Sequence, residues 1–185
     1  MKKHPEVSTR VDLAKYCGKL GYKVGAEIGV CKGKFSRVFC WNVPDIKLYC
    51  IDTWESDIDD PGDEGELNEA NYAHAKRILS PFDTIFIRKN SMEALEDFKD
   101  GSLDFVYIDG NHTFDYIMID LIEWSKKVRK GGIVSGHDYF RLKNKEGFQK
   151  FDVILAVDTY IEAHNIVDAY IIDGDHTPSY FWIKT

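Results

Sequence analysis

The chain has 185 residues, of which 44% are hydrophobic and 30% are charged, so it has the length and composition of one globular domain with a substantial core. The formal net charge of −7 comes from the segment 55–69, which carries eight acidic residues and no basic one, whereas elsewhere 24 basic residues face 23 acidic ones. This balance argues against nucleic acid as a partner. No apolar run approaches the roughly 20 residues of a membrane span, which argues against a membrane protein.

The amino-terminal segment and the cysteines bear on the cellular compartment. The opening "MKKHPEVSTR" has two lysines but no apolar segment behind them, so we expect no secretory signal. The cysteines contain no C-x-x-C pair and are Cys17, Cys31, Cys40 and Cys50. This spacing favours buried, reduced thiols in the cytoplasm over zinc ligands or disulfides.

Short apolar runs alternate with segments of helical periodicity along the whole chain. The predicted strands are 24–30, 48–52, 84–90, 103–109, 132–138, 168–173 and 179–184. The longest helical stripe consists of Ile117, Leu121, Trp124 and Val128. We interpret this stripe as a core face and expect Asp120 and Glu123 to be solvated on the polar face of the same helix.

The order of the predicted elements indicates the fold. Strands that alternate with helices predict an α/β, Rossmann-like fold, in which a doubly wound parallel sheet carries helices on both faces. Only "GDHTP" separates the last two predicted strands, which is too short for a crossover, so they predict an antiparallel terminal hairpin. No linker divides the chain, and residues 1–185 therefore form a single domain in which 55–69 is an acidic loop insertion.

The first predicted strand ends in "EIGVCKGKFS", where Glu27, Gly29 and Gly33 follow the spacing E-x-G-x-x-x-G. Dinucleotide-binding folds use G-x-G-x-x-G instead, because closely spaced glycines admit a pyrophosphate. Here only one glycine lies in the tight turn after the strand, and an acid precedes it, which favours a ligand that presents an amino group and no phosphate to this turn. On its own this motif is weak, since glycines after strands are common in structural turns.

The next two predicted strands end in residues suited to an adenosine. Asp52 stands where an acid accepts hydrogen bonds from ribose hydroxyls. Trp54 is a candidate cover for the adenine, although an aromatic residue after a strand is more often packing. Ser91 and Met92 follow the third strand, where the adenine would lie, and Ser91 also suits a helix N-cap.

With these motifs the sequence resembles the class I S-adenosylmethionine-dependent methyltransferases, and in particular a small bacterial and phage branch. The resemblance runs from about Gly21 to the terminal hairpin and is most specific in "VYIDGNHTFDYIMIDLIEWSKKVRKGGIVSGHDY". The chain departs from this branch at Phe114, where a tyrosine is usual, and in its longer acidic loop. The resemblance implies a seven-stranded sheet of order 3-2-1-4-5-7-6. It also implies S-adenosylmethionine as the cofactor, surrounded by Glu27, Gly29, Gly33, Asp52, Ser91 and Met92. Trp54 and Asp109 are further candidate cofactor-binding residues.

The fourth and fifth predicted strands end in Asp109 and Asp138, and His112 and His137 stand beside them in the sequence. Two carboxylates at neighbouring strand ends suit Mg²⁺, so Asp109 and Asp138 are candidate metal ligands, with His137 as a further one. Sugar-modifying relatives usually have another acid in place of His137. The alternatives are His112 or His137 as a general base, with Asp109 as a further catalytic residue, and a purely structural turn.

The motif "IDGNHT" at 108–113 returns as "IDGDHT" at 172–177. We interpret the second copy as a hairpin tip formed by Asp173, Asp175 and His176, with an aspartate-glycine turn that needs positive φ. The sequence thus predicts an O-methyltransferase for a small hydroxylated molecule, such as a sugar or secondary metabolite, and leaves a homo-oligomer open. The alternatives are a non-catalytic domain that binds S-adenosylmethionine, and a nicotinamide-dependent oxidoreductase. The oxidoreductase is disfavoured because its Y-x-x-x-K spacing, Tyr72 to Lys76, precedes the third strand.

Overall fold

The computed structural model describes residues 1–55, 68–140, 142–143 and 149–185, so most of the predicted acidic insertion lies outside the described residues. The strands are β1 (Lys2–Lys3), β2 (Val24–Ile28), β3 (Lys47–Ile51), β4 (Thr84–Ile87), β5 (Leu103–Ile108), β6 (Val128–Gly136), β7 (Leu142–Lys143), β8 (Gln149–Phe151), β9 (Ala169–Ile172) and β10 (Ser179–Ile183). The helices are α1 (Arg10–Lys19), α2 (Lys34–Asn42), α3 (Asn68–Leu79), α4 (Ser91–Ala94), the 3₁₀ helix η1 (Leu95–Asp97), α5 (Phe114–Lys127) and α6 (Val153–Ala163).

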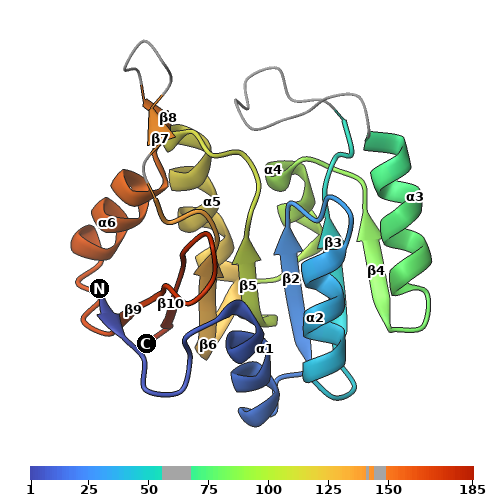
Figure 1. The fold of residues 1–185 in the computed structure, drawn as a ribbon, viewed down its shortest axis with the longest axis horizontal. Coiled ribbons are helices and arrows are strands. Elements are labelled where there is room, and N and C mark those ends of the chain that lie inside the picture. Colours follow the sequence, from blue (N-terminus) through green and yellow to red (C-terminus); the bar gives the residue numbers. More distant parts are fainter. Residues whose placement is uncertain (56–67, 141, 144–148) are drawn as a thin grey trace.

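The central sheet has the order β1-β9-β10-β6-β5-β2-β3-β4 (Figure 1). Strand β10 is antiparallel to both β6 and β9, and the other neighbours pair in parallel. The predicted order 3-2-1-4-5-7-6, including the terminal hairpin, is therefore confirmed. The sequence did not predict β1, which adds an eighth strand at the edge, or the separate β7–β8 pair.

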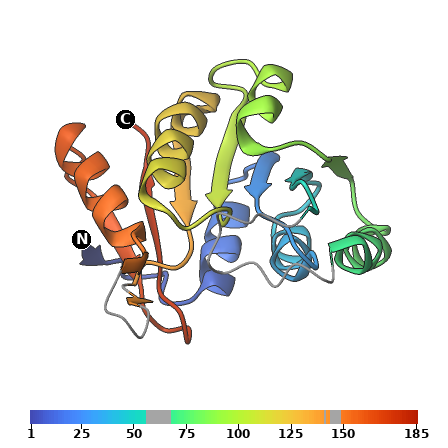
Figure 2. The same ribbon diagram turned by 90° about the horizontal axis from the view of Figure 1, so that it is seen from above.

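The sheet forms the middle of three layers (Figure 2). Helices α1, α2 and α3 cover one face, and α4, α5 and α6 cover the other. Each face has its own apolar cluster, one built around Phe39 and Phe105 and the other around Trp124 and Tyr180. The predicted stripe runs along α5 to Val128, the first residue of β6, and is buried throughout, because each of its members lies in the second cluster.

Three local expectations were wrong. Asp120 is only 4% exposed, because it lies on the edge of the apolar stripe of α5 that packs against the sheet. Cys31 is exposed, since it lies in the loop after β2 rather than in the core. Strand β6 starts directly after α5 at Val128, before the predicted start at 132, so that Gly131, with a φ of 74°, lies within this strand.

Candidate active site

A cavity of about 760 Å³ opens at the carboxyl ends of the parallel strands β2, β3, β4 and β5. Ligands bind at this edge in open α/β sheets because successive loops diverge there. Its lining comes from the loops after these strands and from α3, α4 and α5. The predicted site residues that line it are Gly29, Asp52, Trp54, Ser91, Met92, Asp109 and His112.

Gly29 brings three strand ends together at the floor of this cavity. Its φ is 84°, and a Cβ atom at this position would lie 1.9 Å from the carbonyl oxygen of Asp109. Its N–H donates to the carbonyl oxygen of Ile51 at 2.9 Å. The turn after β2 therefore requires glycine, both for its positive φ and for the close approach of β5.

Asp52 holds the loop that follows β2. Its Oδ2 accepts hydrogen bonds from the backbone N–H groups of Val30, at 2.9 Å, and Cys31, at 2.8 Å. Its Oδ1 accepts from the N–H of Trp54 at 2.7 Å. A carboxylate bound by three backbone donors has a fixed position, so Asp52 shapes the cavity wall before any ligand enters.

Glu27 and Gly33 do not line the cavity but support the same loop from behind. Glu27 is 1% exposed and accepts a hydrogen bond from the hydroxyl of Ser36 in α2, so it ties β2 to the following helix. Burial raises the pKa of Glu27 to about 8, although the Ser36 bond opposes this rise. Gly33 caps α2 with a φ of 70° and lies against Ala75 of α3.

Trp54 has mainly a packing role, although it lines the cavity. It is 2% exposed, and its ring centroid lies 4.7 Å from that of Tyr72 and 5.9 Å from that of Phe86. Its indole N–H donates to the carbonyl oxygen of Cys31 at 2.8 Å. Tyr72 is thus a packing partner on α3, and the Nζ atom of Lys76 lies 5.2 Å from the centroid of its ring.

Ser91 connects the cavity to a buried acid, Asp120, which was expected from the sequence to be solvated. Its hydroxyl donates to Oδ1 of Asp120 and accepts from the indole N–H of Trp124 at 2.7 Å. Asp120 also lines the cavity. Its spacing held the signal that was missed, because Asp120 is three residues after Ile117 and four before Trp124, on the buried side of α5.

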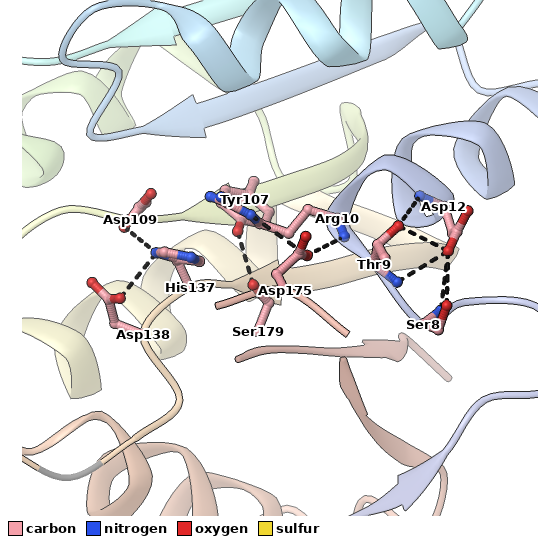
Figure 3. Close-up of polar contacts among 10 residues, drawn as sticks. All are labelled: Ser8, Thr9, Arg10, Asp12, Tyr107, Asp109, His137, Asp138, Asp175 and Ser179. Atoms are coloured by element: carbon pink, nitrogen blue, oxygen red, sulfur yellow. Dashed lines mark hydrogen bonds and ion pairs between the residues drawn. The ribbon is translucent and has the colours of Figure 1, made fainter. Parts of the chain in front are cut away.

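Two acids and two histidines meet beyond β5 and β6, next to the cavity. Nδ1 of His137 lies 3.0 Å from Oδ1 of Asp138 and 3.4 Å from Oδ1 of Asp109 (Figure 3). Nε2 of His112 lies 2.7 Å from Oδ2 of Asp138 and 3.9 Å from Oδ1 of Asp109. One ligand atom each from Asp109, His137 and Asp138 lies within 4.8 Å of the others, a spacing that suits a metal ion.

The charges of this cluster depend on one another. Burial alone would raise the pKa of Asp109 and of Asp138, but the neighbouring His112 and His137 hold both below the usual range. Burial alone would lower the pKa of His137, but hydrogen bonds and charge attraction from Asp109 and Asp138 raise it to about 9. The two carboxylates are thus ionised at neutral pH and attract positive charge.

A second, much smaller space of about 10 Å³ lies behind this cluster and is lined by His112, His137 and Tyr180, among others. Its volume suits about one water molecule. Nε2 of His137 is buried and has no hydrogen-bond partner among the described residues. Among the described residues, the polar contacts of the His137 ring with Asp109 and Asp138 are therefore made through Nδ1.

The second copy of the motif lies away from the cavity and binds the amino-terminal segment (Figure 3). Oδ2 of Asp175 accepts from the N–H of Arg10, the first residue of α1, at 2.6 Å. The N–H of Gly174 donates to the carbonyl oxygen of Ser8 at 2.8 Å. The predicted positive φ at Gly174 was wrong, and glycine is needed instead because a Cβ atom would lie 2.5 Å from that oxygen.

A family model described as a methyltransferase domain matches residues 26–139. Protein y4gI of Sinorhizobium fredii is 31% identical over 123 residues, which cover 60% of this chain and 12% of that protein. The O-methyltransferase of Bacillus cereus, solved with S-adenosylhomocysteine, has a TM-score of 0.67 and 13% identity, over 95% of this chain and 80% of that one. The O-methyltransferase TomG of Streptomyces achromogenes, solved with S-adenosylmethionine, has a TM-score of 0.66 and 13% identity, over 95% of this chain and 79% of that one.

The family match covers more than half of the chain and spans the cavity, Asp109 and the end of β6. The chain therefore belongs to the methyltransferase-domain family, and its fold is that of the class I S-adenosylmethionine-dependent methyltransferases. The predicted methyltransferase family is thus confirmed. Among the described helices, none has the length and apolarity needed to cross a membrane.

Proposed function

We propose that the protein transfers the methyl group of S-adenosylmethionine to a hydroxyl oxygen of a small molecule, such as a sugar or secondary metabolite, with help from a divalent cation. The observation that carries this proposal is the meeting of Asp109, His137 and Asp138 within 4.8 Å, at the edge of the cavity. A hydroxyl has a high pKa, so its oxygen needs help to lose a proton. A cation between carboxylates, or a histidine base, supplies that help.

The cofactor occupies the large cavity in this proposal. Its ribose binds near Asp52, its adenine near Ser91 and Met92, and its methionine part near Gly29 and Asp109. The cavity volume of about 760 Å³ supports this assignment, because it lies in the range of small-molecule sites. Glu27 and Gly33 contribute indirectly, since Glu27 is bonded to Ser36 on the far side of the loop. Trp54 closes the wall near the ribose.

The donor set of Asp109, Asp138 and His137 fits a cation such as Mg²⁺ or Mn²⁺. Both carboxylates are ionised at neutral pH, and together they raise the pKa of His137 to about 9, so the cluster already attracts one positive charge. A divalent ion would compete with that proton for the same oxygen atoms. When bound, the ion would lower the pKa of an acceptor hydroxyl that touches it.

His112 is the residue we assign to proton removal. It lines the cavity, and its Nε2 lies 2.7 Å from Oδ2 of Asp138, so a carboxylate orients the imidazole as in other general bases. In the reaction the acceptor oxygen gives its proton to His112 and forms a bond to the methyl carbon. The carbon–sulfur bond breaks, and its electron pair stays on sulfur, which leaves S-adenosylhomocysteine.

The first test concerns the cofactor and uses titration calorimetry with S-adenosylhomocysteine. We expect Asp52→Ala to weaken binding by about 1–3 kcal/mol, the size of a charge-assisted hydrogen bond. Asp52→Asn is the matched control, because its amide oxygen can still accept from the N–H groups of Val30 and Cys31 while its amide nitrogen replaces the second acceptor, so it should weaken binding less than Asp52→Ala. If both folded variants bind like the wild type, Asp52 is not a ribose contact.

The second test concerns the cation and uses methyl transfer from labelled S-adenosylmethionine to a panel of sugars and phenols. Chelation should remove activity, and Mg²⁺ or Mn²⁺ should restore it. Calorimetry should also detect Mn²⁺ binding to the wild type but not to Asp138→Asn. Full activity in excess EDTA would reject the cation and leave His112 as the base.

The rival classes have their own tests. Thermal shift with NAD against S-adenosylhomocysteine separates an oxidoreductase from a methyltransferase, and we expect stabilisation by the latter ligand alone. A non-catalytic binding domain would keep its affinity for the cofactor, and no acceptor in the panel would be methylated. We further propose a cytoplasmic location, because all four cysteines are free thiols.

A further inference from the structure

Asp120 is the most deeply buried acid that faces the cavity. Asp120 is 4% exposed, and its Oδ1 accepts a hydrogen bond from the hydroxyl of Ser91. Ser91 is itself held by the indole N–H of Trp124 at 2.7 Å. These two hydrogen bonds, from Trp124 to Ser91 and from Ser91 to Asp120, thus fix the carboxyl group of Asp120 in one orientation, with a donor on one side only.

The protein does little to compensate the charge of this carboxylate. No lysine, arginine or histidine of the described residues forms an ion pair with Asp120, and Ser91 is the only hydrogen-bond donor seen there for it. Burial therefore raises the pKa of Asp120 to about 7, although the Ser91 bond opposes this rise. A buried acid without a partner costs free energy, so an empty acceptor position of this kind suits a ligand that brings its own donor.

The second oxygen of Asp120 lies beside Gly110 in the lining of the cavity. A Cβ atom placed on Gly110 would lie 3.9 Å from Oδ2, and both Gly110 and Asp120 line the cavity. The glycine keeps the space beside this oxygen clear. A flat ligand that passes Gly110 can therefore reach Oδ2 with a donor at its edge.

Adenine offers such a donor, because its exocyclic amino group has two N–H bonds. The cavity also contains Asp52 and Ser91, and in the function proposed above the ribose and adenine lie along them. We infer that Asp120 accepts a hydrogen bond from the exocyclic amino group of the adenine and so selects adenosyl over 6-oxopurine ligands. This inference rests on the proposed cofactor and adds the residue that reads its base.

The variant Asp120→Asn distinguishes recognition of the amino group from a merely structural role of Asp120, which would leave the preference between the two ligands unchanged. Asp120→Asn has nearly the same shape, and its amide oxygen can still accept the Ser91 hydroxyl, so packing of α5 is retained. Its amide N–H₂ group can take the place of Oδ2 and would then donate instead of accept. The variant should therefore lose its preference for an amino group while it gains a donor for a 6-oxo group.

The experiment compares two ligands by titration calorimetry, S-adenosylhomocysteine and S-inosylhomocysteine, in which a 6-oxo group replaces the amino group. We expect the wild type to prefer the adenosyl ligand by about 10- to 100-fold, the effect of one hydrogen bond to a charged acceptor. Asp120→Asn should bind the adenosyl ligand more weakly and show no preference or the opposite one. Asp52→Asn is the control, because it should weaken both ligands equally.

Each outcome has a separate meaning. Equal binding of both ligands by the wild type overturns the assignment of Asp120, even if Asp120→Asn does not fold. A folded Asp120→Asn variant with an unchanged preference overturns it as well. Failure of the wild type to bind either ligand rejects the proposed cofactor itself and is thereby distinguished from failure of the inference.

Discussion

The segments 108–113 and 172–177 differ at one position, Asn111 against Asp175, yet the fold uses them in opposite ways. The first follows β5, whose neighbours are β2 and β6, and its acid Asp109 meets the histidines of the cluster. The second follows β9, three strands from β5, and joins it to the antiparallel β10. Its acids bind Lys3 and the N–H of Arg10 instead.

The difference teaches that position in the sheet decides what this motif does. After an inner parallel strand, an acid and a histidine face other strand ends across the topological crevice. After β9, the same residues lie in a hairpin loop, where the nearest groups are the backbone of Ser8 and the first turn of α1. There Thr9 caps α1 through a capping box with Asp12 (Figure 3), and Asp175 adds a further acceptor at the same helix end.

Exchange of each histidine for alanine gives the largest contrast between the two copies. We expect His112→Ala to lower kcat for methyl transfer by about 10²- to 10⁴-fold, because it removes the proton acceptor. His176 is exposed, and His176→Ala should leave kcat unchanged. Steady-state rates with the same acceptor measure both, and calorimetry with S-adenosylhomocysteine checks that the cavity is intact. Equal losses in the two variants would contradict the division of roles.

The second contrast is in the dependence of stability on pH. The pKa of His137 is raised from 6.5 to about 9, which corresponds to about 3 kcal/mol of stability in the metal-free protein. Because the folded state holds this proton more tightly, the contribution is complete below pH 6.5 and is lost as the pH rises through 9. Urea unfolding in EDTA at pH 6 and pH 9.5 measures it. His137→Gln should lose less stability over this window than the wild type, whereas His176→Gln should follow the wild type.

The glycines of the two copies give the third contrast. A Cβ atom at Gly174 would lie 2.5 Å from the carbonyl oxygen of Ser8, so Gly174→Ala should destabilise the fold by about 1–3 kcal/mol. A Cβ atom at Gly110 would have its closest contact at 3.7 Å, which is ordinary. Gly110→Ala should therefore leave the unfolding free energy unchanged and weaken cofactor binding, since Gly110 lines the cavity. Thermal unfolding and calorimetry together test the pair.

The smallest contrast lies within the second copy. Asp175→Ala removes an acceptor at the first N–H of α1 and should cost about 1 kcal/mol of unfolding free energy, as for other helix caps. Asp173 pairs with Lys3 on the surface, and Asp173→Ala should have no measurable effect on stability. Neither change should alter kcat. A rate loss in Asp175→Ala without unfolding would show that the hairpin tip takes part in catalysis.

The order of the sheet was predicted through the resemblance to the methyltransferase family, which rests on the long motif around 108–139. Local signals alone predicted the alternation of strands and helices and, from the short "GDHTP" connection, the antiparallel terminal hairpin. The sequence missed β1 because two exposed lysines carry no strand pattern and pair with β9 only in the folded chain. It also missed the role of Gly174, because the contact with Ser8 joins residues that are distant in sequence.

The candidate site was predicted in part for the same reason. Strand-end residues such as Asp52, Ser91 and Asp109 were found because a parallel sheet brings its carboxyl ends to one edge. Asp120 was not, since a charged residue on a helix is usually solvated, although its place on the edge of the apolar stripe of α5 indicated burial, and the hydrogen bond from Ser91 satisfies one of its oxygens there. The hydrogen bonds that Asp52 accepts from the N–H groups of Val30 and Cys31 were not predicted either, because they depend on the geometry of the loop after β2, which the spacing of residues does not encode.

One tryptophan in the cavity wall and one behind it give the protein an optical property. Trp54 lines the cavity, and Trp124 lies behind the wall and donates to Ser91, which lines it, whereas Trp41, which is 63% exposed, and Trp182 do not line it. A purine that enters the cavity changes the polarity around the first pair while the second pair keeps its surroundings. Intrinsic fluorescence should therefore follow occupancy in real time, without a label, and Trp54→Phe would separate the signal of the ribose side from that of the base side.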